Sequence, residues 1–128
     1  MTDQLTPHFG LAELRCRCGC SAEPALVASL TRVAQALEQL RTTIGRPVQV
    51  VSGHRCPRRN RQVGGSPRSQ HMAGTAVDVQ VKGMTGVQVR EVMERLIAAG
   101  QVPDGGIGTY ADRPWTLHYD QRSIPARW

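Results

Sequence analysis

The chain has 128 residues, 40% of them hydrophobic and 20% charged, which is typical of one globular domain, residues 1–128, with a single core. Its formal net charge of +6 predicts an anionic partner, such as a cell-wall polymer, a peptide carboxylate or a nucleic acid. Because only 4% of the residues are aromatic, few side chains could stack on bases, and a nucleic-acid partner is disfavoured.

The segment Met1 to Phe9 lacks the basic start and the apolar run of a secretory signal. No stretch of the sequence approaches the roughly 20 apolar residues that a membrane span requires. We therefore expect a protein that is made in the cytoplasm, with no signal peptide and no membrane span. Separately, we expect it to be a monomer.

Pro24 to Ile44 is predicted to form a long amphipathic helix, because apolar residues recur there at spacings of three and four and make one stripe. The stripe consists of Leu26, Leu30, Val33, Leu37, Leu40 and Ile44. Ser21 is a candidate N-cap, and Gly45 supplies a stop signal.

The middle of the chain predicts two strands separated by a turn and a loop. Pro47 to Ser52 is rich in valine and predicts a strand; Pro57 to Val63 predicts a short helical turn, and Gly64 to Pro67 a loop. Thr75 to Val81 alternates cleanly, with three valines on one side and Asp78 on the polar side.

The last third predicts a second amphipathic helix at Thr85 to Ala99, a glycine-rich bend at Gly105 to Gly108 and a strand at Trp115 to Asp120. His118 and Asp120 share one face of that strand. The order helix, strand, strand, helix, strand predicts an α+β fold. We expect a small, mostly antiparallel sheet, flanked by two amphipathic helices, with a metal site on the sheet face.

Two of the four histidines lie close to aspartates in strand-like sequence, in the segments Ser69 to Asp78 and Leu117 to Asp120. Two imidazoles and a carboxylate are the protein ligands of a catalytic zinc, which keeps its fourth position for water. We predict one zinc per chain, bound by His71, Asp78 and His118. A structural zinc is disfavoured because a closed site needs a fourth protein ligand.

These motifs resemble the D-alanyl-D-alanine carboxypeptidase family of zinc peptidases, especially its compact, phage-associated members. That family is related in fold to lysostaphin-type endopeptidases and to the hedgehog domain. The resemblance rests on Ser-x-His-x-x-Gly-x-Ala-x-Asp at 69–78 with His118, on Ser-Gly-His-Arg-Cys-Pro at 52–57, on the segment 8–20 and on Ala-Arg-Trp at 126–128. It therefore spans nearly the whole chain in order.

A zinc peptidase needs a general base, usually a carboxylate within reach of the attacking water. Asp120 shares a strand face with a predicted ligand, roughly 7 Å away along the strand, and we predict that it is this base. The alternative is a structural acid that pairs with an arginine. The best-known dipeptidases of the family place glutamate three residues before the last histidine, where this chain has Trp115.

Two further site residues are expected beside the metal. The resemblance implies that Arg55 orients and polarises the substrate carbonyl or carboxylate; the alternative is a solvated surface arginine. Ser69 is predicted to hydrogen-bond the substrate or a ligand side chain, or else to cap a turn.

Cys16, Cys18, Cys20 and Cys56 fit no usual zinc knuckle, because Cys-x-Cys-x-Cys is tighter than Cys-x-x-Cys. Free thiols, two disulfides and a second metal site all remain open. The position of Cys56 beside the site loop favours a staple between that loop and the N-terminal segment.

The resemblance implies a zinc metallopeptidase that hydrolyses a peptidoglycan stem-peptide bond near D-alanine, as a carboxypeptidase or an endopeptidase. Cell-wall degradation by a phage endolysin is the expected setting. The alternative is a non-catalytic, metal-containing domain for cell-wall binding or signalling. A third hypothesis, a nucleic-acid binder that uses the arginines between Arg55 and Arg68, predicts salt-sensitive binding to oligonucleotides.

Overall fold

The computed structural model describes residues 4–16, 24–66 and 69–128. Its main sheet has five strands in the order β3-β4-β6-β5-β7. The strands are β3 (Gln49–Ser52), β4 (Ala76–Gln80), β5 (Gly106–Tyr110), β6 (Arg113–Asp120) and β7 (Ala126–Arg127). Neighbouring strands are antiparallel except β5 and β7, which run parallel. The predicted α+β class with a mostly antiparallel sheet is therefore confirmed.

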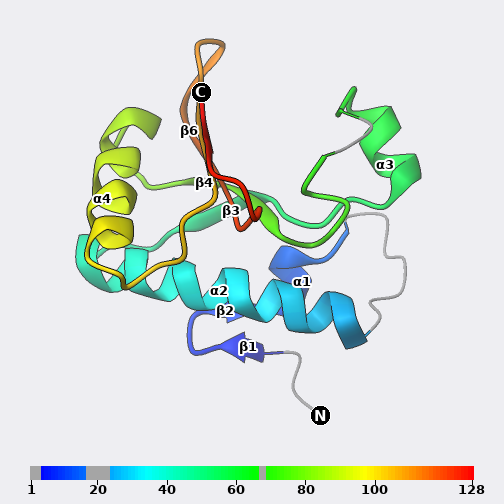
Figure 1. Cartoon of the computed structure of the whole chain (residues 1–128), viewed down its shortest axis with the longest axis horizontal. Helices are drawn as coiled ribbons and strands as arrows, with labels where there is room; N and C mark the ends of the chain where they lie inside the picture. The colour runs from blue at the N-terminus through cyan, green and yellow to red at the C-terminus, as the bar shows by residue number, and fades with distance from the viewer. Residues whose placement is uncertain (1–3, 17–23, 67–68) are drawn as a thin grey trace.

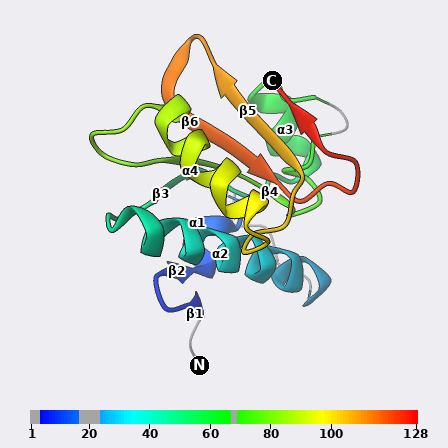
Figure 2. The same ribbon diagram turned by 60° about the vertical axis from the view of Figure 1, so that its left-hand side comes forward.

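Two long helices cover one face of this sheet (Figures 1 and 2). They are α2 (Pro24–Ile44) and α4 (Gly86–Ala98). The bounds of α2 agree with the predicted stripe, and Leu30, Val33, Leu37 and Leu40 are fully buried. None of the described helices is both long and apolar enough to cross a bilayer. Ser21, the candidate N-cap, lies outside the described residues.

The alternation predicted for β4 decides which face of the sheet is core. Val77 and Val79 are fully buried in one cluster with side chains of α2 and α4. Asp78, between them, projects to the opposite face, where the polar side chains of β6 also lie. The helices therefore cover the apolar face of the sheet and leave its polar face for a functional site.

Short elements complete the fold. A small sheet of β1 (Gln4–Thr6) and β2 (Phe9–Gly10) leads into α1 (Leu11–Leu14), and α3 (Pro57–Gln62) follows β3. The pattern of the sequence predicted α3 as a turn but gave no indication of β1, β2, α1 or β7, which are only two to four residues long.

The bend predicted at Gly105 to Gly108 is wrong, because Gly106–Tyr110 forms the strand β5. Glycine occurs here for packing rather than for turning. A Cβ on Gly106 would collide with Asp120, and a Cβ on Gly108 would collide with the indole of Trp128. Strand glycines often mark such close approaches.

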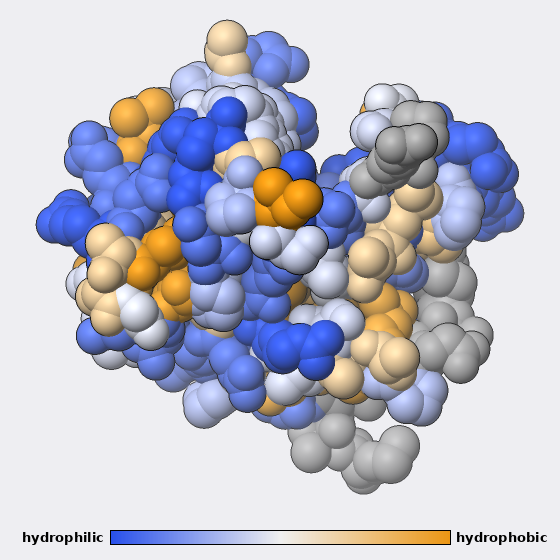
Figure 3. Space-filling model, in the orientation of Figure 1, coloured by the Kyte–Doolittle hydropathy of each residue, from blue (hydrophilic) through white to orange (hydrophobic). Residues whose placement is uncertain are grey.

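A cleft of about 820 Å³ opens on the polar side of the sheet. Figure 1 shows the β5–β6 hairpin and α3 on its two sides, and Figure 3 shows the hollow between them. One wall is formed by the start of α3 and the loop after it, and the other by the hairpin, Arg122 and Trp128. His71, Asp78 and His118 lie among its lining residues.

Candidate metal centre and active site

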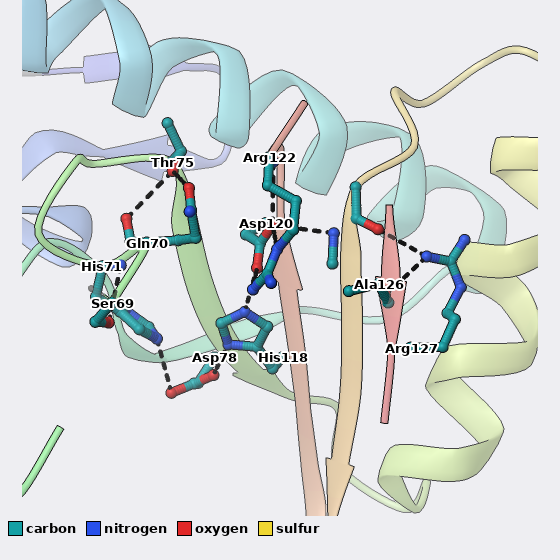
Figure 4. Close-up of polar contacts among 12 residues, drawn as sticks. Ser69, Gln70, His71, Thr75, Asp78, His118, Asp120, Arg122, Ala126 and Arg127 are labelled. Atoms are coloured by element: carbon teal, nitrogen blue, oxygen red, sulfur yellow. Dashed lines mark hydrogen bonds and ion pairs between the residues drawn. The ribbon is translucent and has the colours of Figure 1, made fainter. Parts of the chain in front are cut away.

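Three side chains distant in sequence converge on the floor of this cleft (Figure 4). Asp78 lies in the middle of β4, and His118 is its direct partner in the antiparallel register with β6. His71 comes from the loop that precedes β4. The sheet therefore sets the position of two of these groups, and the loop brings in the third.

The geometry of this trio matches a metal centre. One potential ligand atom from each of His71, Asp78 and His118 lies within 4.8 Å of the other two. Nδ1 of His118 is 3.0 Å from Oδ1 of Asp78, and Nε2 of His71 is 3.3 Å from Oδ2. All three residues are buried. Two imidazole nitrogens and a carboxylate are a donor set that zinc prefers.

The orientation of His71 leaves one ring nitrogen for a metal. Its Nδ1 is 2.7 Å from the carbonyl oxygen of Gly53, so the N–H belongs at Nδ1 and donates to that carbonyl. Nε2 is buried and has no hydrogen-bond partner, although it is within ion-pair distance of Asp78. A buried, unsatisfied imidazole nitrogen that faces a carboxylate fits a zinc ligand.

Asp120 contacts His118 at the ring nitrogen that faces away from Asp78. Its Oδ2 is 2.7 Å from Nε2 of His118. Because an ionised carboxylate can only accept, the proton belongs at Nε2, and Nδ1 faces Asp78. Figure 4 shows Asp120 and Asp78 on opposite sides of the His118 ring.

Arg122 donates hydrogen bonds to both oxygens of the Asp120 carboxylate. Its Nε donates to Oδ1 at 2.8 Å and its terminal nitrogen to Oδ2 at 2.6 Å. The backbone N–H groups of Gly106 and Arg122 also donate to Oδ1. Asp120 is 0% exposed, and it is absent from the residues that line the cleft. This geometry contains the arginine pair that was the alternative to the predicted general base.

The neighbouring histidines and Arg122 keep both aspartates ionised. Burial opposes the charged form of Asp78, but the adjacent imidazoles of His118 and His71 outweigh it and hold the pKa well below its usual value. Burial likewise opposes the ionisation of Asp120, whereas Arg122 and His118 lower its pKa. The two carboxylates in turn raise the pKa of His118 against the effect of burial.

Arg55 lies at the edge of the trio, with its guanidinium 3.7 Å from Oδ2 of Asp78. It is half-buried, and Asn60 accepts a 3.1 Å hydrogen bond from it. A Cβ on Gly65 would collide with both of these side chains. Arg55 is therefore held in the cleft, unlike a solvated surface arginine.

Ser69 lines the same cleft. Its hydroxyl accepts a 3.2 Å hydrogen bond from the backbone N–H of His71. This contact caps the turn that carries His71, which was one of the two predicted roles. Its place in the cleft wall is compatible with the other role, a contact with substrate.

A model of the peptidase M15 family matches residues 7–120, a range that includes the whole His71, Asp78 and His118 trio. The chain belongs to the peptidase M15 family. This confirms the resemblance to zinc peptidases of the D-alanyl-D-alanine carboxypeptidase type and makes the protein a member of a metallopeptidase family. No match was found among curated proteins.

The M15 site includes residues that the sequence did not indicate. Trp128 lies against His118, with ring centroids 5.0 Å apart, and its indole fills the space beside Gly108. Arg122 stacks over the same indole at 5.0 Å. The Asp-x-Arg spacing of Asp120 and Arg122 was the one available signal for this pair. Nothing local in the sequence indicated that Trp128 lies beside the metal site.

The N-terminal segment of the M15 domain reaches the start of α3 through two cysteines. The backbone N–H of Cys56 lies 3.4 Å from Sγ of Cys16. Sγ of Cys56 accepts from the N–H of Arg59 and caps α3. This contact joins the two segments that the predicted staple would connect. Cys18 and Cys20 lie outside the described residues.

Proposed function

We propose that this protein is a zinc peptidase that hydrolyses a peptidoglycan stem-peptide bond near D-alanine, as a carboxypeptidase or an endopeptidase. The observation that carries the proposal is the His71, Asp78 and His118 trio on the floor of an open cleft. Membership of the M15 family and the net charge of +6 support an anionic peptide of the cell wall as substrate.

His71, Asp78 and His118 would hold the metal through Nε2, a carboxylate oxygen and Nδ1. A zinc ion there would act as a Lewis acid, polarising a carbonyl and lowering the pKa of a water ligand to about 7. The Gly53 carbonyl fixes the tautomer of His71. Asp120 orients the ring of His118 in the same way. Because both imidazoles are oriented in the absence of the metal, tight binding of the metal is favoured.

We assign Asp120 a positioning role. It keeps the proton on Nε2 of His118 and so presents Nδ1 to the metal, while Arg122 holds the carboxylate in place. Its effect on the reaction passes through His118, because Asp120 is fully buried, does not line the cleft, and has both oxygens engaged in hydrogen bonds.

Arg55 would bind the substrate. Its half-buried guanidinium lies beside Asp78 and can donate two parallel hydrogen bonds to a substrate carboxylate or carbonyl. Gly64 and Gly65 allow an extended peptide backbone to approach the cleft floor without side-chain obstruction. Ser69, on the same wall, would hydrogen-bond that backbone.

The test is digestion of stem peptides by the zinc-loaded protein, followed by mass analysis of the products. We expect cleavage next to D-alanine, loss of cleavage with a chelator and recovery with zinc. An all-L peptide of the same composition should be cleaved much more slowly. Efficient cleavage of the all-L peptide would contradict the assigned substrate class.

Arg55→Ala has a matched control in Arg58→Ala, since Arg58 is exposed on α3 and does not line the cleft. We expect kcat/KM to fall strongly in the first variant and to stay near wild type in the second. Equal effects would remove Arg55 from the substrate site.

One observation favours a second candidate, a metal-containing domain that binds the wall without cutting it. Among the described residues that line the cleft, Asp78 is the one carboxylate, so no separate acid is placed to serve as general base. This candidate predicts zinc-dependent binding to purified wall fragments with no peptide product.

A further inference from the structure

The cleft contains far more positive than negative charge. Four arginines line it, Arg55, Arg59, Arg113 and Arg122, against the single carboxylate of Asp78 in the described part of the chain. Arg122 is neutralised by Asp120, and Arg55 shares Asp78 with the two histidines. Within residues 4–16, 24–66 and 69–128, no acidic side chain forms an ion pair with Arg59 or Arg113.

Arg113 is held in a defined position without an acid. Its guanidinium carbon lies 4.1 Å from the centroid of the Tyr110 ring, a cation–π contact across the β5–β6 pair. A guanidinium stacked on a ring by its face keeps its N–H edge available for a planar acceptor.

A register shift explains why Arg113 reaches the cleft. The β5–β6 ladder is interrupted between Thr109 and Tyr110, so Tyr110 pairs with Arg113 out of the regular alternation. Leu117 and Tyr119, at odd positions of the same strand, are buried in the core. Such bulges commonly redirect side chains toward active sites.

The positive charges act on one another across the cleft. Burial lowers the pKa of Arg55, Asp78 opposes that effect, and the charges of Arg113 and Arg59 add to it. Arg113 and Arg55 lie on opposite walls, the first on the hairpin and the second in the segment between β3 and α3. An anionic ligand between the walls would relieve this repulsion.

We propose that Arg113, stacked on Tyr110, forms a second carboxylate subsite on the wall opposite Arg55, and that it selects peptides with two carboxylates near the scissile bond. This inference rests on the proposed peptidase function. Suitable ligands carry one free carboxylate at the peptide end and another as the backbone α-carboxylate of a γ-linked acidic residue. Each carboxylate would meet one guanidinium edge.

The test uses four stem-type peptides that share one sequence. The α-carboxylate of the γ-linked residue is either free or a carboxamide, and so is the terminal carboxylate. We expect the wild type to prefer each free carboxylate over its amide by about tenfold in kcat/KM, as expected for a lost charge-assisted hydrogen bond. Arg113→Gln should abolish the preference at one of the two positions, because the peptide with a free carboxylate there is slowed to the rate of its amide. The position at which the preference is lost identifies the carboxylate that Arg113 binds.

The matched control is Arg58→Gln, which removes one positive charge outside the cleft and should keep the preference. The inference is overturned if Arg113→Gln slows all four peptides equally, which would indicate a structural role, or if it changes none of them. If the wild type cleaves none of the four, the proposed function fails instead. Calorimetric affinities of the same peptides for the zinc-loaded protein then decide the subsite: a carboxylate preference lost in Arg113→Gln supports it, and its absence refutes it.

Discussion

Each histidine of the trio is fixed at one ring nitrogen and directed toward Asp78 by the other. A backbone carbonyl fixes His71, whereas a buried carboxylate fixes His118. The difference matters because the carboxylate carries charge. It makes His118 a stronger electron donor than a neutral partner would, and Arg122 keeps the cost of burying that charge low.

The zinc ligands can be tested against a histidine outside the cleft. His118→Ala should remove the bound zinc, because two ligands and water hold the ion poorly. His8→Ala should keep it, since His8 pairs with Glu38 on the surface. Metal analysis of the purified proteins measures both. Full zinc occupancy in His118→Ala would refute the ligand assignment.

Asp120→Asn distinguishes a positioning residue from a general base. The amide lacks the charge that orients His118, so we expect zinc affinity to fall by roughly 10- to 100-fold. Turnover should recover when zinc is added in excess. A general base would instead lose about 100-fold in turnover at saturating zinc with unchanged affinity. Glu91→Gln, on the exposed face of α4, controls for the loss of one negative charge.

The elements around the site are positioned by packing on both faces of the sheet. The valines of β4 are buried against α2 and α4, which fixes the strand that carries Asp78. On the other face, the glycines of β5 allow Asp120 and Trp128 to lie directly against the strand. Its glycine content predicted a bend, but the glycines occur in a strand because larger residues would collide with Asp120 and Trp128.

A double-mutant cycle tests this account of β5. Gly108→Ala places a methyl group where the Trp128 indole lies, so we expect it to lower the free energy of unfolding by about 1–3 kcal/mol. In a Trp128→Ala background the same change should cost much less. Urea denaturation of the four proteins gives the coupling energy. A coupling near zero would show that Trp128 does not occupy this space in solution.

Across the whole molecule, ion pairs tie segments that are distant in sequence. Arg127 of β7 contacts Asp104 at 2.6 Å and Glu94 of α4 at 3.1 Å. It therefore joins β7, the loop before β5 and α4. The contrast with the cleft is clear, because Arg59 and Arg113 have no such acidic partner within the described ranges.

This surface network predicts a pH-dependent contribution to stability. Hydrogen bonds from Arg127 and from the N–H of Gly105 lower the pKa of Asp104 in the folded state. Its contribution is therefore complete above the unfolded value of about 3.9 and is lost as the pH falls through the lower folded value. Because Asp104 is exposed, Asp104→Asn should cost less than about 1 kcal/mol at pH 7.

Urea unfolding at pH 7 and pH 3, with chelator present throughout, measures this effect. The difference between Asp104→Asn and wild type should shrink at the lower pH. Glu91→Gln provides the control, with no difference expected at either pH. A penalty for Asp104→Asn that is equal at both pH values would contradict the predicted role of ionisation.

The sequence alone determined α2, the inward face of β4 and the three residues that converge on the cleft floor, because periodicity and ligand chemistry are local properties. It also placed His118 and Asp120 on one strand face. Only the tertiary structure decided what the carboxylate of Asp120 contacts. Strand alternation specifies a face, whereas the neighbours of each oxygen depend on Arg122, which follows the strand, and on Gly106 in the next strand. The opposing arginine walls likewise arise because segments some sixty residues apart in the chain flank one cleft on the polar face of the sheet.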